Sequence, residues 1–181
     1  MEYYTGRGIG RIFEEVLRAR EAYVISPWIS GKYAVELARA VKEGRAYVIT
    51  SLDSEFLGQL GYTISHTRLI IGIIIATIGI ITSIISPIVG IPIITTGIII
   101  TIYRKARQRP DWAGRIRVSP KLGNNGFIHI KLYIADGQAW IGSANMTPSA
   151  IHNNIEVLVP IPRELALEIF KYAWARAKPW P

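Results

Sequence analysis

Apolar and polar positions in the first 51 residues follow the periods of helices and short strands. An apolar face at helical spacing predicts an amphipathic helix from residue 9 to about residue 20. The apolar runs 22–26 and 45–51 predict two buried strands. A second helical pattern lies between them and stops at Gly44, as helices often do at glycine. A helix between two short strands predicts a parallel pair with a crossover connection.

The middle of the chain, from Leu69 to Tyr103, has no charged side chain and consists mainly of isoleucine. One continuous helix of this length would measure about 52 Å, whereas the hydrocarbon core of a bilayer is roughly 30 Å thick. We therefore predict two antiparallel passes, with a turn at 86–92 where prolines and a glycine interrupt the helix. The alternative is a buried helical hairpin in the core of a soluble protein.

Small residues support close packing of the two predicted helices. Gly72, Ala76, Gly79 and Ser83 recur at spacings that place them on one face of the first helix. Such a face lets two helices approach each other closely, either within the hairpin or between subunits.

Basic residues follow this segment directly: Arg104, Lys105, Arg107 and Arg109. By the positive-inside tendency they predict an integral protein of the cell membrane whose remaining residues lie in the cytoplasm. The same residues would lie at the membrane surface against anionic head groups. The alternative is that they are ordinary flanks of a membrane segment without selectivity for a lipid.

The remaining part of the chain again alternates between strands and helices. The pattern predicts strands at 115–118, 127–136, 138–141 and 155–160, followed by a helix at about 163–178. The sequence thus predicts an α/β fold with a mixed sheet flanked by helices. It is divided into a first part at 1–66, a transmembrane helical hairpin insertion at 67–104 and a second part at 105–181.

The charge balance points to a polyanionic partner. The chain has 21 lysines and arginines against 13 acidic residues, a net charge of +8. This balance suits either a nucleic acid or an anionic membrane surface. The chain has no cysteine, which excludes disulfides, a cysteine nucleophile and a zinc finger.

The predicted strand 127–136 carries the residues with chemical potential. His129 and Lys131 are two positions apart and would share one face of the strand, while Ile128 and Leu132 point to the other face. Ser143 and Asn145 follow shortly after. Lysine supplies charge to a phosphate, serine and asparagine supply neutral donors, and histidine can act as nucleophile or proton carrier near neutral pH. This combination suits a phosphate group.

The spacing His129-x-Lys131-x4-Asp136, followed by Gly142-Ser143-x-Asn145, resembles the signature motif of the phospholipase D superfamily. Glu156 stands where this family has a glutamate that supports the histidine. Five residues separate Asp136 from Gly142 where six are more common, which shortens the intervening hairpin by one residue. The order of the first helices and strands agrees with the opening of the family's domain.

The resemblance implies a phosphodiesterase whose catalytic residues are His129, Lys131, Asp136 and Glu156. His129 would attack phosphorus and form a phosphohistidine intermediate. Lys131, Ser143 and Asn145 would bind the substrate phosphate. Glu156 would accept the proton of the second ring nitrogen of His129, and Asp136 would either orient Lys131 or close the turn after the strand.

The family builds its active site from two copies of this motif, and the present chain has one. The resemblance therefore implies a homodimer in which His129 of each subunit enters one shared site. It implies no metal and no cofactor.

Three functions fit this scaffold. The first is a membrane-embedded hydrolase of phospholipids, resembling phospholipase D and cardiolipin hydrolases, with the hairpin bringing the site to its substrate. The second is a membrane-tethered endonuclease that cleaves DNA or RNA by the same chemistry, which the net charge of +8 would suit. The third is an inactive membrane scaffold. Because the hairpin places the site at a lipid surface, we favour the first.

Overall fold

The computed structural model describes residues 2–61, 67–102, 110–121 and 126–180. It divides the chain into two compact units. One unit consists of Met1–Tyr62 together with Pro110–Pro181, and the other is Thr63–Arg109.

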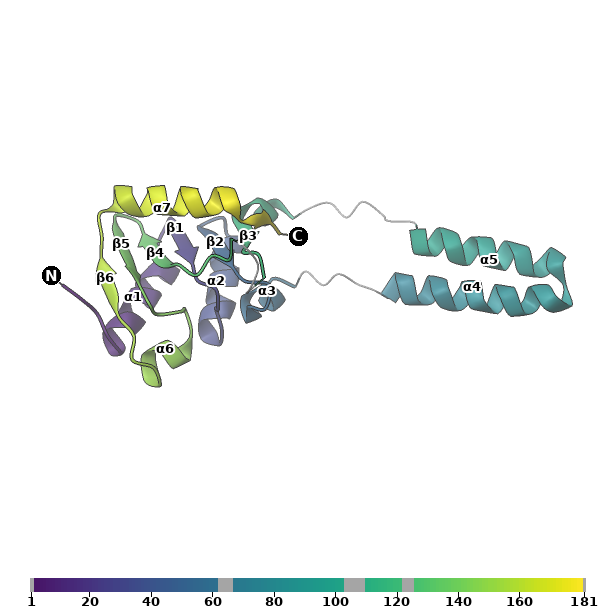
Figure 1. Ribbon diagram of the computed structural model, residues 1–181, viewed down its shortest axis with the longest axis horizontal. Helices are drawn as coiled ribbons and strands as arrows, with labels where there is room; N and C mark the ends of the chain where they lie inside the picture. The colour runs from purple at the N-terminus through teal and green to yellow at the C-terminus, as the bar shows by residue number, and fades with distance from the viewer. Residues whose placement is uncertain (1, 62–66, 103–109, 122–125, 181) are drawn as a thin grey trace. The chain divides into compact units, whose positions relative to one another are not determined.

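The first unit is a mixed α/β domain (Figure 1). Its helices are α1 (Arg7–Arg18), α2 (Lys32–Lys42), α3 (Glu55–Gln59), the 3-10 helix η1 (Asp111–Arg115), α6 (Pro148–His152) and α7 (Arg163–Arg176). Its strands are β1 (Ala22–Ile25), β2 (Ala46–Thr50), β3 (Ile116–Val118), β4 (Lys131–Ala135), β5 (Gln138–Gly142), β6 (Leu158–Pro160) and β7 (Lys178–Pro179).

The strands form one sheet, which has seven strands in the described part of the chain, in the order β6-β5-β4-β1-β2-β3-β7. β1, β2 and β3 are parallel, which confirms the predicted parallel pair and its crossover through α2. β4 joins the other side of β1 in antiparallel orientation, and β5 and β6 continue from it. The predicted mixed sheet flanked by helices is thus confirmed.

Helices cover both faces of this sheet, with α1 and α2 on one face and α7 on the other (Figure 1). Alternate residues of the central strands divide between the two resulting cores. Val24, Val48 and Tyr133 pack with the first group of helices. Ile25, Ile49 and Leu132 pack with α7. The site residues therefore project from a sheet that is fixed on both sides, which limits their movement.

Two predicted strands are shorter than their sequence patterns. β4 begins at Lys131, so residues 127–130 precede the strand. The register explains this: Leu132 pairs with Ile25, and β1 ends shortly before Pro27, which has no amide hydrogen for a ladder bond. β6 begins at Leu158 opposite Gly142, so Glu156 lies outside the strand on which it was predicted.

The second unit contains α4 (Thr67–Ile85) and α5 (Pro87–Ile102), which pack side by side (Figure 1). The chain reverses at Ser86, within the predicted turn. The turn is shorter than predicted, because α5 starts at Pro87 and continues through Pro92. Proline is well suited to the first position of a helix, where its missing amide hydrogen would have no helical partner.

Small residues lie where the two helices meet, as the sequence predicts. A β-carbon on Gly79 would lie 2.6 Å from the backbone nitrogen of Ile94, so the backbones approach too closely for any side chain there. The isoleucines at the end of the hairpin are exposed: Ile84 by 81%, Ile85 by 86% and Ile88 by 87%. The hairpin thus packs through its small residues and presents its large apolar residues outward.

Among the residues described, none of the helices combines the length and apolar character needed to cross a bilayer. The structure therefore supports the helical hairpin but not the predicted transmembrane passes. The predicted membrane-surface residues Arg104, Lys105, Arg107 and Arg109 lie outside the described residues.

Candidate active site

His129 and Lys131 lie together at the start of β4, as the sequence predicts. The Lys131 ammonium donates to the carbonyl oxygen of His129 at 2.9 Å. Its nitrogen also lies 2.9 Å from Nε2 and 3.1 Å from Nδ1 of the imidazole. A neutral imidazole has one acceptor nitrogen, so one of these two contacts can be a hydrogen bond. The lysine thus contacts both the backbone and the ring of the histidine.

Buried contacts fix the segment before β4. The amide of Ile128 donates to the hydroxyl of Ser119 at 2.7 Å, and the side chain of Ile128 is buried against the core under α7. Because the side chain of Ile128 points into the core, the neighbouring His129 points outward, and it is exposed. The hydroxyl of Ser119 therefore holds this segment where no neighbouring strand pairs with it.

The electrostatic surroundings favour a neutral His129. Partial burial lowers the pKa of the imidazole below its ordinary value, and the charge of Lys131 lowers it further. Burial also lowers the pKa of Lys131, and the negative charge of Glu156 partly opposes this effect. A neutral imidazole beside a cation is the form that can attack an electrophile.

Ser143 reaches the site because β5 and β6 approach closely at Gly142. A β-carbon on Gly142 would collide with the carbonyl oxygen of Val157, so only glycine fits this position. The amide of Ser143 donates to the carbonyl oxygen of Val157 at 3.0 Å. The Ser143 hydroxyl accepts from the amide of Val157 at 3.1 Å. Ser143 is exposed beyond the end of the strand.

Glu156 has a different partner from the predicted one. Its Oε2 accepts a hydrogen bond from the hydroxyl of Ser143, and its Oε1 accepts from the side-chain nitrogen Nδ2 of Asn154 at 3.2 Å. Among the described residues, these are its hydrogen-bond partners, and His129 is not one of them. The structure therefore connects Glu156 to Ser143 by a hydrogen bond and to Lys131 by charge.

Asn145 contacts a residue that the motif does not include. Its Oδ1 lies 3.5 Å from the hydroxyl of Ser26, a fully buried serine at the end of β1. The amide of Met146 donates to the same hydroxyl at 3.0 Å. The carbonyl oxygen of Ala144 accepts from the buried Tyr133 at 2.6 Å. The segment after β5 is thus held by neighbouring strands. Ser26 belongs to no sequence motif, and its place at the end of a strand is the one feature that could have indicated a role.

Aromatic rings flank His129. The ring of Trp28 lies edge-on to the imidazole with centroids 5.9 Å apart, and the ring of Phe127 lies at 5.8 Å. Trp28 is 36% exposed. Trp28 therefore borders the candidate active site.

Asp136 lies at the opposite end of β4, roughly 16 Å along the strand from Lys131. Its carboxylate accepts from the amides of Arg20 and Glu21, each at 3.0 Å. Its carbonyl oxygen accepts from Nε of Arg163 at 2.6 Å, and its φ is +49°. Asp136 thus closes the turn and ties it to the start of β1. Of its two predicted roles the structure supports the turn, and it does not bring Asp136 to Lys131.

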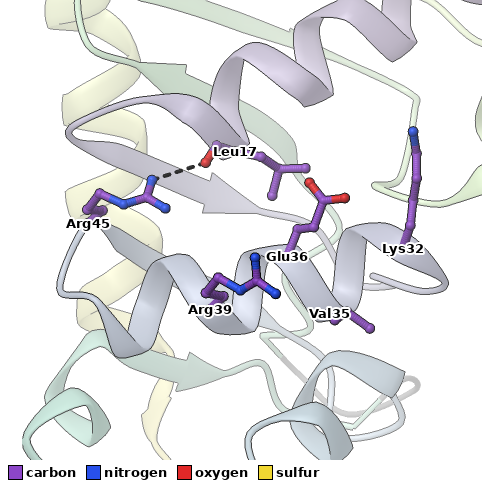
Figure 2. A pocket seen from close by; sticks show the side chains of 6 residues that line it. All are labelled: Leu17, Lys32, Val35, Glu36, Arg39 and Arg45. Atoms are coloured by element: carbon purple, nitrogen blue, oxygen red, sulfur yellow. Dashed lines mark hydrogen bonds between the residues drawn. The ribbon is translucent and has the colours of Figure 1, made fainter.

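A hollow elsewhere on the molecule does not involve these residues. A shallow pocket of about 430 Å³ between α1 and α2 is lined by Leu17, Lys32, Val35, Glu36, Arg39 and Arg45 (Figure 2). Arg45 donates to the carbonyl oxygen of Leu17 at 3.0 Å there, as the dashed line in Figure 2 shows. Lys32 pairs with Glu14 and Arg45 bonds the backbone of Leu17, so both side chains connect to α1. His129, Lys131 and Ser143 do not line this pocket.

Comparisons with known proteins show a family and a fold. A family model described as "Cardiolipin synthase, PLD-like domain" matches residues 62–175, more than half of the chain. None of the curated proteins matches this chain. Among solved structures, the phospholipase D family member Nuc from Salmonella typhimurium is similar, with a TM-score of 0.50 and 15% identity over 98% of this chain and 94% of that one. NucT from Helicobacter pylori matches with a TM-score of 0.47 and 15% identity, over 95% of this chain and 90% of that one.

The chain belongs to the phospholipase D superfamily, in the family described as cardiolipin synthase, PLD-like domain. The matched residues include the whole motif from His129 to Glu156.

Proposed function

We propose that this protein is a phosphodiesterase that hydrolyses phospholipids through a phosphohistidine at His129. The observation that carries the proposal is the contact of Lys131 with the imidazole of His129 at an exposed site beside Ser143. A phosphodiester resists attack because its oxygens are negatively charged. An ammonium beside the nucleophile reduces this repulsion and stabilises the charge that develops in the transition state.

The proposed reaction has two steps. The neutral imidazole of His129 attacks phosphorus, a nitrogen–phosphorus bond forms, and the bond to the leaving alcohol oxygen breaks. Lys131 and Asn145 donate to the phosphate oxygens during this step. The hydrogen of the Ser143 hydroxyl is donated to Glu156 in the structure, so this hydroxyl turns toward the phosphate to donate as well. Water then attacks phosphorus, the nitrogen–phosphorus bond breaks, and a phosphomonoester is released. The electron pair of that bond returns to the ring nitrogen, so His129 is again a neutral imidazole.

A second subunit would supply the proton for the leaving group. The described chain presents one copy of the motif at an open surface, and two such sites facing each other would enclose one phosphate. In the proposed homodimer, the partner's His129 donates a proton to the leaving oxygen and accepts a proton from the attacking water.

The hairpin supports a lipid substrate. Its outward isoleucines are exposed to a degree that is uncommon for soluble proteins. Burial of one such side chain in an apolar medium contributes about 1.5–3 kcal/mol. We propose that the hairpin associates with the cell membrane and that the catalytic unit lies in the cytoplasm. We further propose that Arg104, Lys105, Arg107 and Arg109 bind anionic head groups.

Cleavage of nucleic acid is a second candidate, and the net charge of +8 is the observation that favours it. A phosphate backbone would bind through lysines and arginines, and its affinity would fall steeply with salt. The lipid proposal ranks first because charge suits either substrate, whereas exposed isoleucines suit lipid.

An assay of the purified protein on labelled phospholipid vesicles and on single-stranded DNA would test the proposal. We expect release of a phosphomonoester lipid, unchanged by a chelator, and no release by His129→Ala. Cleavage of DNA alone would establish the second candidate and refute the first. An active His129→Ala variant would refute the assigned nucleophile, and a phosphorylated His129 detected by mass spectrometry would support it.

A further inference from the structure

Ser26 is fully buried at the carboxyl end of β1, where it contacts two segments of the candidate active site. Its hydroxyl donates to the carbonyl oxygen of Trp28 at 2.8 Å and accepts from the amide of Met146 at 3.0 Å. The first segment carries the ring beside His129, and the second carries Asn145. One hydroxyl thus joins both sides of the site.

The same hydroxyl places the segment that carries Asn145. Its single hydrogen is donated to Trp28, so the separation of 3.5 Å from Oδ1 of Asn145 is a packing contact. The hydrogen bond that holds the segment comes from the amide of Met146, the residue directly after Asn145. Ser26 therefore acts on Asn145 through the backbone.

Backbone contacts also join the Trp28 segment to the Asn145 segment beside this serine. Ile29 forms an isolated parallel bridge with Met146, and the amide of Ser30 donates to the carbonyl oxygen of Met146 at 3.2 Å. The hydroxyl of Ser54 bonds the backbone of Ile29 alone, whereas the hydroxyl of Ser26 bonds both segments.

We propose that Ser26 is a positioning residue that holds the Asn145 segment against the Trp28 segment and so places Asn145 for the substrate phosphate. This inference rests on the proposed function for its substrate, whereas the placement of Asn145 can be tested with inorganic phosphate alone. Ser26 does not touch the reacting atoms. It acts through Asn145 and, by its contact with Trp28, keeps the Asn145 segment at a fixed place relative to His129.

Removal of this hydroxyl has a matched control in the same region. Ser51 is also buried, and its hydroxyl donates to the carbonyl oxygen of Pro27 at 2.6 Å. That oxygen also accepts from the hydroxyl of Thr50 and the amide of Ser51. Ser51→Ala therefore removes a buried hydroxyl without releasing the Asn145 segment, and it reports the general cost of such a change.

We expect Ser26→Ala to lower kcat/KM on phospholipid vesicles about tenfold, the effect of one lost buried hydrogen bond, while Ser51→Ala retains the wild-type value. In the background of Asn145→Ala, Ser26→Ala should have little further effect, because residues that act together are not additive. Additive losses, or equal losses in Ser26→Ala and Ser51→Ala, would overturn the proposal.

A second measurement does not need the enzymatic reaction. Nuclear magnetic resonance would follow the side-chain amide of Asn145 during titration with inorganic phosphate. We expect phosphate to shift this resonance in the wild type and in Ser51→Ala, and to bind Ser26→Ala about tenfold more weakly. Equal binding by Ser26→Ala would overturn the role of Ser26, even for a protein that cleaves neither lipid nor DNA. Inactivity of the wild type on both substrates would instead refute the proposed function.

Discussion

The ammonium of Lys131 lies against the imidazole of His129, 2.9 Å from Nε2, and also donates to the backbone carbonyl oxygen of the same histidine. The two residues differ by two positions in sequence and share one face of the chain. This contact helps to place the ring, and the lysine charge adds to the effect of burial in disfavouring the charged form of the ring.

The pKa of His129 should respond to the charge of Lys131. Partial burial is the main cause of its lowered pKa, and the lysine charge is the second. Lys131→Met removes the charge and leaves the burial, so the pKa should rise toward its ordinary value without reaching it. The histidine would then be protonated at a higher pH. Titration of the His129 ring resonance measures this shift, and the curve of the exposed His152 serves as the internal control.

In the wild type, the fall of kcat/KM at low pH should follow the titration of His129. Only neutral His129 can attack phosphorus, so activity should fall as the pH drops through its lowered pKa. Lys131→Met should also reduce kcat by about two orders of magnitude or more, because a cationic donor at the developing charge is lost. A lower pKa of His129 in Lys131→Met would contradict the electrostatic assignment.

The proposed homodimer predicts a characteristic response to mixing. If each site needs His129 from both subunits, a dimer of one wild-type and one His129→Ala subunit is inactive. After subunit exchange in an equal mixture, activity should fall to about one quarter of the wild-type value, since only wild-type pairs remain active. Independent sites would give about one half. Assays over a series of mixing ratios distinguish a quadratic from a linear dependence.

Asp136 should matter for stability and little for chemistry. Asp136→Ala removes a carboxylate that accepts from the amides of Arg20 and Glu21 and places alanine at a positive φ. The loss should lower the free energy of unfolding by about 1–2 kcal/mol, while kcat per folded molecule stays near the wild-type value. Asp53→Ala, which removes an exposed carboxylate from another loop, is the control for denaturant unfolding. A large loss of kcat in fully folded Asp136→Ala would show a catalytic role.

Glu156 should act through Ser143. The Ser143 hydroxyl donates to Glu156 and accepts from the amide of Val157, which fixes its orientation. Glu156→Ala and Ser143→Ala should each lower kcat/KM about tenfold, and the double variant should lose little more. Glu156→Gln keeps an oxygen acceptor for the hydroxyl and should retain more activity than Glu156→Ala. If Glu156 instead supported His129 directly, the losses of Glu156→Ala and Ser143→Ala would add.

Local patterns predicted much of this molecule. Apolar periodicity in the first 51 residues identified α1, β1, α2 and β2, because the two helices bury one face and the two strands are buried on both faces of the sheet. The spacing of His129 and Lys131 predicted their contact because adjacent same-face positions meet whatever the surrounding fold.

Tertiary contacts decided the features that the sequence did not predict. Pro27, distant in sequence, ends the partner strand and leaves His129 before β4. The partner of Glu156 depends on how closely β6 approaches Gly142, which no periodicity encodes. Ser26 and Asn145 lie in contact although they are 119 residues apart in the sequence. The sequence around Ser26 therefore gives no sign that this serine belongs to the site.

The same separation has a consequence for how the molecule is made. The hydroxyl of Ser26 reaches the amide of Met146 only after the chain between them, including the whole isoleucine-rich hairpin, has been synthesised. Pairing of β1 with β4 requires the same long loop to close, which is a slow event in folding. A growing chain therefore exposes its most apolar segment before its catalytic groups can assemble. Association of the hairpin with a lipid surface at this stage would both prevent aggregation and delay the appearance of activity until the enzyme is in place.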